Sequence, residues 1–227
     1  MTRIRRAAAC CVLFAFFLFC CAFKTPAQDY KVEKAAAAPP QELSTAVQDA
    51  LGDEALRASG PNGPLCEIWL RKLVPVKSAA AETLGVTFGQ LNEGTLVGAV
   101  RFPAEVKDYR RQQIKPGIYT LRYALLPSDG NHIGVALQRD FLLASPAALD
   151  QDPATVSRND ALNMSRRTTG TNHPSVWSLG PALSDASSLP AITRQEVGAL
   201  WVLSFRVPGA DGSLTMGLVV VGSAPEA

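Results

Sequence analysis

The sequence has 227 residues, of which 47% are hydrophobic and 19% charged, and its formal net charge is +2. Four of the 22 basic residues and none of the 20 acidic ones precede position 28, so the remainder carries 18 basic and 20 acidic groups, a net charge of −2. A mildly acidic chain with mixed charges lacks the electrostatic footprint that nucleic acids require, which excludes nucleic acid as a partner. The roughly 200 residues after the leader suffice for one sizeable core.

Residues 1–27 have the layout of a secretory signal peptide. Three arginines lie within residues 3–6, an unbroken apolar run covers 7–23, and Thr25 and Ala27 are small residues at the positions a signal peptidase recognises. We therefore expect cleavage near Ala27 and a secreted or periplasmic protein.

Two alternatives for this leader stay open. The apolar run is nearly long enough to cross a bilayer, so it could remain as a membrane anchor, and the membrane would then be contacted only through this segment. A lipoprotein acylated at Cys20 or Cys21 is the other alternative, and the bulky Phe19 argues against it because a small residue is expected there.

Cys66 is the one cysteine outside the leader, which holds the other four. A single cysteine cannot form an internal disulfide, so the exported domain has to be held together by its core. Its neighbours indicate a strand in which Cys66 is a small buried hydrophobe. A catalytic thiol needs an electropositive setting, and the adjacent Glu67 argues against one.

The segment 28–54 is expected to be a linker followed by a short amphipathic helix, ahead of a β domain at 55–227. Residues 28–40 are polar, then alanine-rich, then Pro-Pro, which is typical of a tether. Leu43, Val47 and Leu51 recur at helical spacing within 41–51.

Alternating apolar side chains predict strands from residue 55 onward. The clearest runs from Tyr119, with every second residue to Leu125 apolar, and a further strand is expected at 140–144. Turn-forming residues predict three hairpins. These join 55–58 to 65–74, 86–88 to 95–102, and 198–207 to 214–221. Residues 79–84 favour a helical turn, and 176–179 a short strand.

One helix is predicted within residues 152–169. Ser157 and Asp160 form a capping-box pattern, and Arg166 and Arg167 near the C-terminal end complement the helix dipole before Gly170. The whole pattern predicts a mainly β protein, an antiparallel β-sandwich of jelly-roll or Ig-like type with this short inserted helix, or else an open barrel.

The two histidines lie in similar Asn-His loops, at 128–132 and 170–174. His132 and His173 together with Asp129 and Asp140 offer imidazole nitrogens and carboxylate oxygens, a ligand set for zinc or another divalent metal ion. The alternative is that each histidine is a turn residue bonded to nearby backbone.

Asn131 and Asn172, which precede the histidines, are candidate ligand contacts that would also fix the loop geometry. Trp69 shares a predicted strand face with Glu67 and Arg71, so it is a candidate exposed aromatic contact for a ligand. Packing beneath the N-terminal helix would explain it equally well. Trp201 alternates with apolar residues and is expected in the core. Nucleophile-elbow, metalloprotease and phosphate-loop motifs are absent from the sequence.

The stretches 116–123, 129–132 and 170–174 together resemble uncharacterised secreted β-rich proteins of environmental bacteria. This resemblance implies no activity. The sequence favours a secreted or periplasmic module that binds a protein, a small molecule or a carbohydrate. A metal-dependent enzyme built on the two Asn-His loops and an envelope-tethered structural protein are the alternatives.

Overall fold

The computed structural model describes residues 30–77, 83–129, 132, 134–183 and 185–224. The expected signal peptide, Asn131 and most of the helical turn predicted at 79–84 lie outside these residues. Within the described ranges, no helix has both the length and the apolar character needed to cross a membrane.

The chain is mainly β, with 45% strand and 12% helix, which confirms the predicted class. Ten strands form one large sheet: β1 (Lys31–Ala36), β2 (Leu51–Gly60), β3 (Gly63–Arg71), β4 (Leu96–Phe102), β7 (Gly117–Leu125), β8 (Asp140–Pro146), β9 (Trp177–Gly180), β10 (Ala191–Gln195), β11 (Leu200–Gly209) and β12 (Gly212–Val221). The small hairpin strands are β5 (Val106–Lys107) and β6 (Gln113–Ile114). The helices are α1 (Thr45–Ala50), α2 (Arg158–Thr169) and the 3₁₀ turns η1 (Ala186–Ser188) and η2 (Val197–Ala199).

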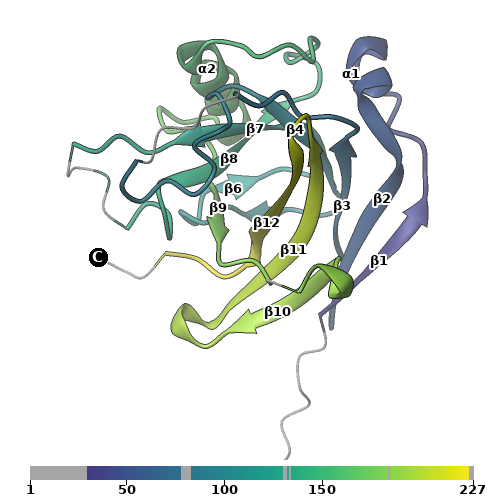
Figure 1. The fold of residues 1–227 in the computed structure, drawn as a ribbon, viewed down its shortest axis with the longest axis vertical. Coiled ribbons are helices and arrows are strands. Elements are labelled where there is room, and N and C mark those ends of the chain that lie inside the picture. The colour runs from purple at the N-terminus through teal and green to yellow at the C-terminus, as the bar shows by residue number, and fades with distance from the viewer. Residues whose placement is uncertain (1–29, 78–82, 130–131, 133, 184, 225–227) are drawn as a thin grey trace, which may run out of the picture.

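The large sheet is antiparallel throughout, with the strand order β1-β2-β3-β4-β7-β8-β9-β12-β11-β10, and it curls until it is nearly barrel-shaped (Figure 1). Its two edge strands approach each other, and the rings of Tyr30 and Trp201 lie 4.4 Å apart between centroids at this seam. A two-sheet sandwich is not confirmed. The four-residue strand β9 pairs with β8 on one side and β12 on the other, so it joins what would otherwise be two sheets.

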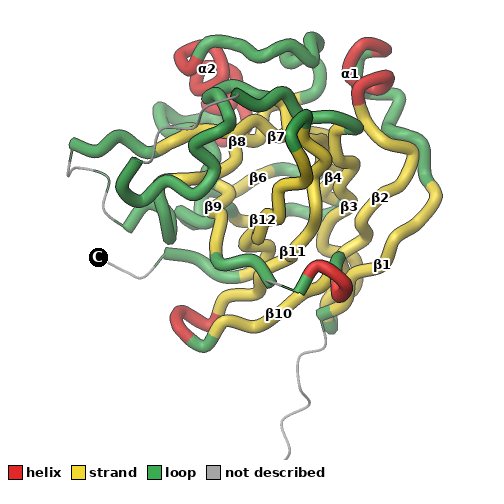
Figure 2. Tube along the Cα trace, viewed as in Figure 1, coloured by secondary structure: helices red, strands yellow, loops and turns green. Residues whose placement is uncertain are grey.

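The main core lies inside the curled sheet, because alternate residues of most of its strands meet in one cluster. Examples are Leu56 of β2, Leu121 of β7 and Phe205 of β11. Two smaller clusters of buried residues lie on the outer face of the sheet. One packs against α2 and includes Ala161, and the other packs against α1 and includes Val47. Both α-helices lie at the same end of the sheet (Figure 2).

Several sequence predictions are confirmed. Helix α2 begins as expected, because the Ser157 Oγ accepts a hydrogen bond from the Asp160 amide at 3.1 Å. It ends at Gly170, which has a left-handed backbone conformation. The hairpins β2–β3 and β11–β12, and the paired strands β7 and β8, correspond to predicted strands.

Two expectations are wrong. Residues 31–36 are not a tether: they form β1, which pairs with β2 from Lys31 opposite Ser59 to Ala36 opposite Glu54. This edge strand is largely exposed, so its polar sequence carries no alternating signal. Residues 86–88 form no strand, because the Thr87 and Phe88 amides bond the Asp140 carboxylate instead of a neighbouring strand. Within 41–51, the structure has the six-residue helix α1.

Candidate functional site

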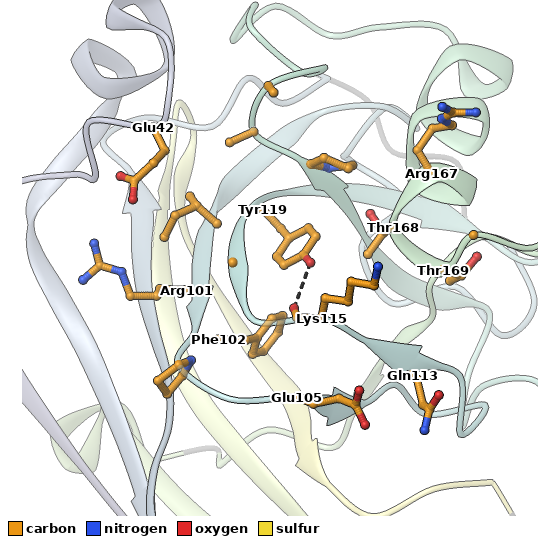
Figure 3. Close-up of a pocket in the computed structure, with 17 residues that line it drawn as sticks. Glu42, Arg101, Phe102, Glu105, Gln113, Lys115, Tyr119, Arg167, Thr168 and Thr169 are labelled. Carbon is orange, nitrogen blue, oxygen red and sulfur yellow. Dashed lines mark hydrogen bonds between the residues drawn. The ribbon is translucent and has the colours of Figure 1, made fainter.

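A groove of about 750 Å³ lies between α1 and α2 (Figure 3). Its floor comes from β7 and the end of β8, one wall from the residues around α1 and β4, and the other from the last turn of α2. The β5–β6 hairpin forms the lower rim. The lining residues are Glu42, Arg101, Phe102, Pro103, Glu105, Gln113, Lys115, Gly117, Ile118, Tyr119, Pro146, Ala147, Ala148, Arg167, Thr168, Thr169 and Gly170.

The groove is positioned by the crossover loop, residues 147–157, which connects β8 to α2. Arg122 of β7 lies beneath this loop and is completely buried. Its Nε and Nη2 atoms donate to the two carboxylate oxygens of Asp150 at 2.6 and 2.7 Å. A bidentate arginine–carboxylate pair is directional as well as strong, so it fixes the loop against the strand.

The other guanidinium hydrogens of Arg122 bind backbone carbonyls. Nη1 donates to Gly94 and Ala154 at 2.6 and 2.8 Å, and Nη2 also donates to Asp152. All five N–H donors of the side chain are therefore used, as burial of a charge requires. We call Arg122, Asp150 and these three carbonyls the Arg122 node. It holds the crossover loop, which contributes Ala147 and Ala148 to the groove lining and leads into the start of α2.

The α2 wall has a second anchor on β8. The Thr168 hydroxyl donates to the Ala144 carbonyl at 2.8 Å, and the Ala144 amide donates to the Ser175 hydroxyl at 2.8 Å. The Ser165 and Ser175 hydroxyls lie 2.9 Å apart. These contacts are buried, so they hold the last turn of α2 in one position over the sheet.

The α1 wall is fixed through Trp69. This side chain is 1% exposed, and its indole Nε1 donates to the Ala37 carbonyl at 2.9 Å. It packs with Leu43, Val47 and Leu51 beneath α1, so the packing alternative is the correct one and Trp69 is not an exposed ligand contact. The guanidinium of Arg101, on the groove side, lies 5.4 Å from the centroid of the Trp69 ring.

The β5–β6 rim is held by the buried Asp108. Its carboxylate accepts hydrogen bonds from the Arg110, Gln112 and Val176 amides at 2.8–2.9 Å. Burial raises the pKa of Asp108 above its usual range, and these hydrogen bonds oppose that rise. At the top of the rim, the Tyr119 hydroxyl donates to the Lys115 carbonyl at 2.8 Å, which fixes the backbone from which the Lys115 side chain extends.

The groove carries three cations and two acids. Arg101 is paired with Glu67 at 2.9 Å, outside the groove lining. Lys115 and Arg167 are exposed and, in the part of the chain that the structure describes, neither forms an ion pair or a side-chain hydrogen bond. Figure 3 shows Arg167 on the α2 side with Thr168 and Thr169, and Glu42 on the opposite side near Arg101. The two unpartnered cations therefore lie toward the α2 wall.

The structure brings together only one pair of the predicted metal ligands. His132 Nδ1 lies 3.0 Å from the Asp129 carboxylate, on an exposed loop. Asp140 is completely buried and accepts hydrogen bonds from the Thr87 and Phe88 amides and, at 2.6 Å, from the Tyr123 hydroxyl. Its carboxylate holds the 83–91 loop on the sheet.

The second Asn-His loop has its own local contacts. The His173 carbonyl accepts hydrogen bonds from the Thr169 and Thr171 hydroxyls, and the Asn172 carbonyl accepts one from Arg166 at 2.9 Å. These bonds involve the main-chain carbonyls of His173 and Asn172, and they fix the turn that follows α2. Across the described ranges, no group of three or more His, Cys, Asp or Glu side chains is placed to hold a metal ion. Asn131 lies outside those ranges.

Comparison with known protein families, characterised proteins and solved structures gives no match to this chain. Sequence reasoning identified Arg167 only as a helix-capping cation and gave Lys115 no role. It missed Asp150 entirely. The sequence offered one signal for Asp150. Arg122 is a cation in the middle of the most regular strand, and a cation buried there needs an acidic partner.

Proposed function

We propose that the protein is a binding or interaction module that acts after export, in the periplasm or outside the cell, and that its ligand occupies the groove between α1 and α2. The export part rests on the leader pattern of residues 1–27. The observation that supports a ligand site is the groove itself, a cavity of about 750 Å³ with exposed polar side chains around a partly apolar floor. Ligand sites of proteins are commonly concave and of this size.

The rigidity of the surroundings favours binding. The groove floor lies on paired strands, and both walls are attached by buried polar contacts: the Arg122 node, the Thr168–Ala144 bond and the Trp69–Ala37 bond. A site held in one geometry loses little conformational entropy when the ligand arrives, which raises affinity. Because the lining residues come from five separated segments, the groove exists only in the folded chain.

A fragment screen followed by ¹⁵N NMR tests this proposal without knowledge of the ligand. We expect binding fragments to shift the amides of Gly117, Ile118 and Thr169 more than amides elsewhere. Ala148 is exposed and lines the groove, so Ala148→Trp should block these shifts without unfolding the protein. Ala46→Trp, at an exposed position of α1 that does not line the groove, is the matched control.

Fragment shifts that persist in Ala148→Trp, or that concentrate around another cavity, would contradict the proposal.

A further inference from the structure

We propose that the groove recognises a ligand with anionic oxygen groups, carboxylate or phosphate, held between Lys115 and Arg167. This inference rests on the proposed function and specifies its ligand class. Both side chains line the groove, at separate positions on its α2 side: Lys115 comes from the end of the β5–β6 hairpin and Arg167 from the last turn of α2 (Figure 3).

Two of the three cations of the groove lack a partner within the described residues. Arg101, the third cation of the groove, is already engaged by Glu67 and lies over the Trp69 ring. Lys115 and Arg167 have no such engagement within the described chain, so their donors are available to a ligand. A guanidinium offers a planar fork suited to carboxylate and phosphate oxygens, and an ammonium adds three further donors.

Three negative groups oppose these two cations: the C-terminus of α2, Glu42 and Glu105. The C-terminus of α2 contributes about half a negative charge, and one of its carbonyls is already bonded twice: the Arg166 carbonyl accepts from the Gly170 amide at 2.9 Å and from the Thr169 hydroxyl at 3.2 Å. Two full positive charges outweigh this partial one. Of the two acids, Glu42 lies on the α1 side, away from Arg167, and Glu105 lies on the lower rim, below Lys115 (Figure 3).

The groove is poorly suited to a neutral sugar. Exposed aromatic rings would be needed for stacking against a pyranose face, and the aromatic residues of this groove are buried. Phe102 is 4% and Tyr119 6% exposed, and both belong to the interior core. A divalent cation is disfavoured as well, since the described residues contain no cluster of metal-ligating side chains. Charge is thus the main feature that the groove offers a ligand.

Isothermal titration calorimetry with three matched trimers tests the inference: trigalacturonate, tripolyphosphate and neutral maltotriose. The test variant is Lys115→Gln/Arg167→Gln. The control, Lys107→Gln/Arg110→Gln, removes two cations that do not line the groove and thus changes the net charge equally. An exposed cation within about 4 Å of an anion contributes roughly fivefold to affinity, so we expect the test variant to bind about 10- to 25-fold more weakly. The control should lose less than about threefold.

Binding of trigalacturonate alone would identify a carboxylate ligand, and binding of tripolyphosphate alone a phosphate ligand. Binding of both would indicate recognition of charge. The inference is overturned if neither anion binds, or if the two double variants lose affinity equally. Ala148→Trp separates the two proposals. Maltotriose binding that this variant abolishes would keep the groove and reject the anion, whereas anion binding that it leaves unchanged would reject the groove.

Discussion

Replacement of Arg122 by methionine should destabilise the protein strongly. Arg122 is completely buried and Asp150 is 2% exposed, so the substitution leaves a buried carboxylate without its cation. It also removes hydrogen bonds to the carbonyls of Gly94, Asp152 and Ala154. Breaking a buried ion pair by removing one partner costs about 3–5 kcal/mol. At about 2–4 °C per kcal/mol for a domain of this size, the melting temperature should fall by roughly 10 °C.

The measurement is urea denaturation followed by circular dichroism, with calorimetry for the melting temperature. Arg57→Met is the matched control, since Arg57 pairs with Glu67 at 2.8 Å but is 45% exposed. An exposed pair of this kind contributes about 0–1 kcal/mol. The double variant Arg122→Met/Asp150→Asn should lose less stability than the sum of the two single variants, because no unpaired charge remains. A loss below 1 kcal/mol in Arg122→Met would refute the role of the Arg122 node.

Three further predictions concern Gly94, Cys66 and Tyr123. Gly94→Ala should cost more than about 1 kcal/mol in denaturation experiments, because Gly94 has φ 82° and an added Cβ would collide with the Val156 carbonyl; an unchanged midpoint would show that the loop can shift. Burial, with a smaller contribution from Glu67, raises the pKa of Cys66 to about 12, so the native thiol should resist alkylation at pH 8 and react only on unfolding; rapid native labelling would contradict this. Burial and the hydrogen bond to Asp140 raise the pKa of Tyr123 well above its usual range. The folded state then keeps a proton that the unfolded state loses above about pH 10, so stability should fall as pH rises past 10, and less steeply in Tyr123→Phe. Equal slopes in the two proteins would contradict the assignment.

Local sequence patterns predicted the elements whose side chains alternate cleanly. Strand β7 and the β11–β12 hairpin have apolar residues at every second position, and α2 has a cap, a cationic end and a stop glycine. Strand β1 has no such pattern, because an exposed edge strand buries almost nothing and is held by its backbone pairing with β2. Residues 31–36 form a strand because β2 pairs with them, and their own sequence does not reveal this pairing.

The arrangement of the strands depended equally on distant pairing. The four residues of β9 were expected as a strand, but their position between β8 and β12 makes one curled sheet out of two. Alternation within a strand says which side chains share a face and nothing about which strands are neighbours. The single sheet could therefore be anticipated only as the open-barrel alternative.

The candidate site was harder to predict, because burial on the outer face of the sheet comes from the helices and loops that cover it. Trp69 and Arg122 both lie on that face. Alternation alone suggested exposure for Trp69, but α1 covers it and the crossover loop covers Arg122. Asp140 likewise fits a metal ligand by residue type, yet its oxygens are used by two amides and a tyrosine. Residue types identified possible chemistry, and the tertiary contacts decided which of it was available.

The most direct test of the groove is a crystal structure of the protein soaked with the trimeric anion that binds more tightly in calorimetry. We expect ligand density between the β5–β6 rim and the last turn of α2, with one anionic group within about 3 Å of Lys115 Nζ and another within about 3 Å of the Arg167 guanidinium. Density elsewhere, or ligand in the groove that contacts neither cation, would contradict this expectation.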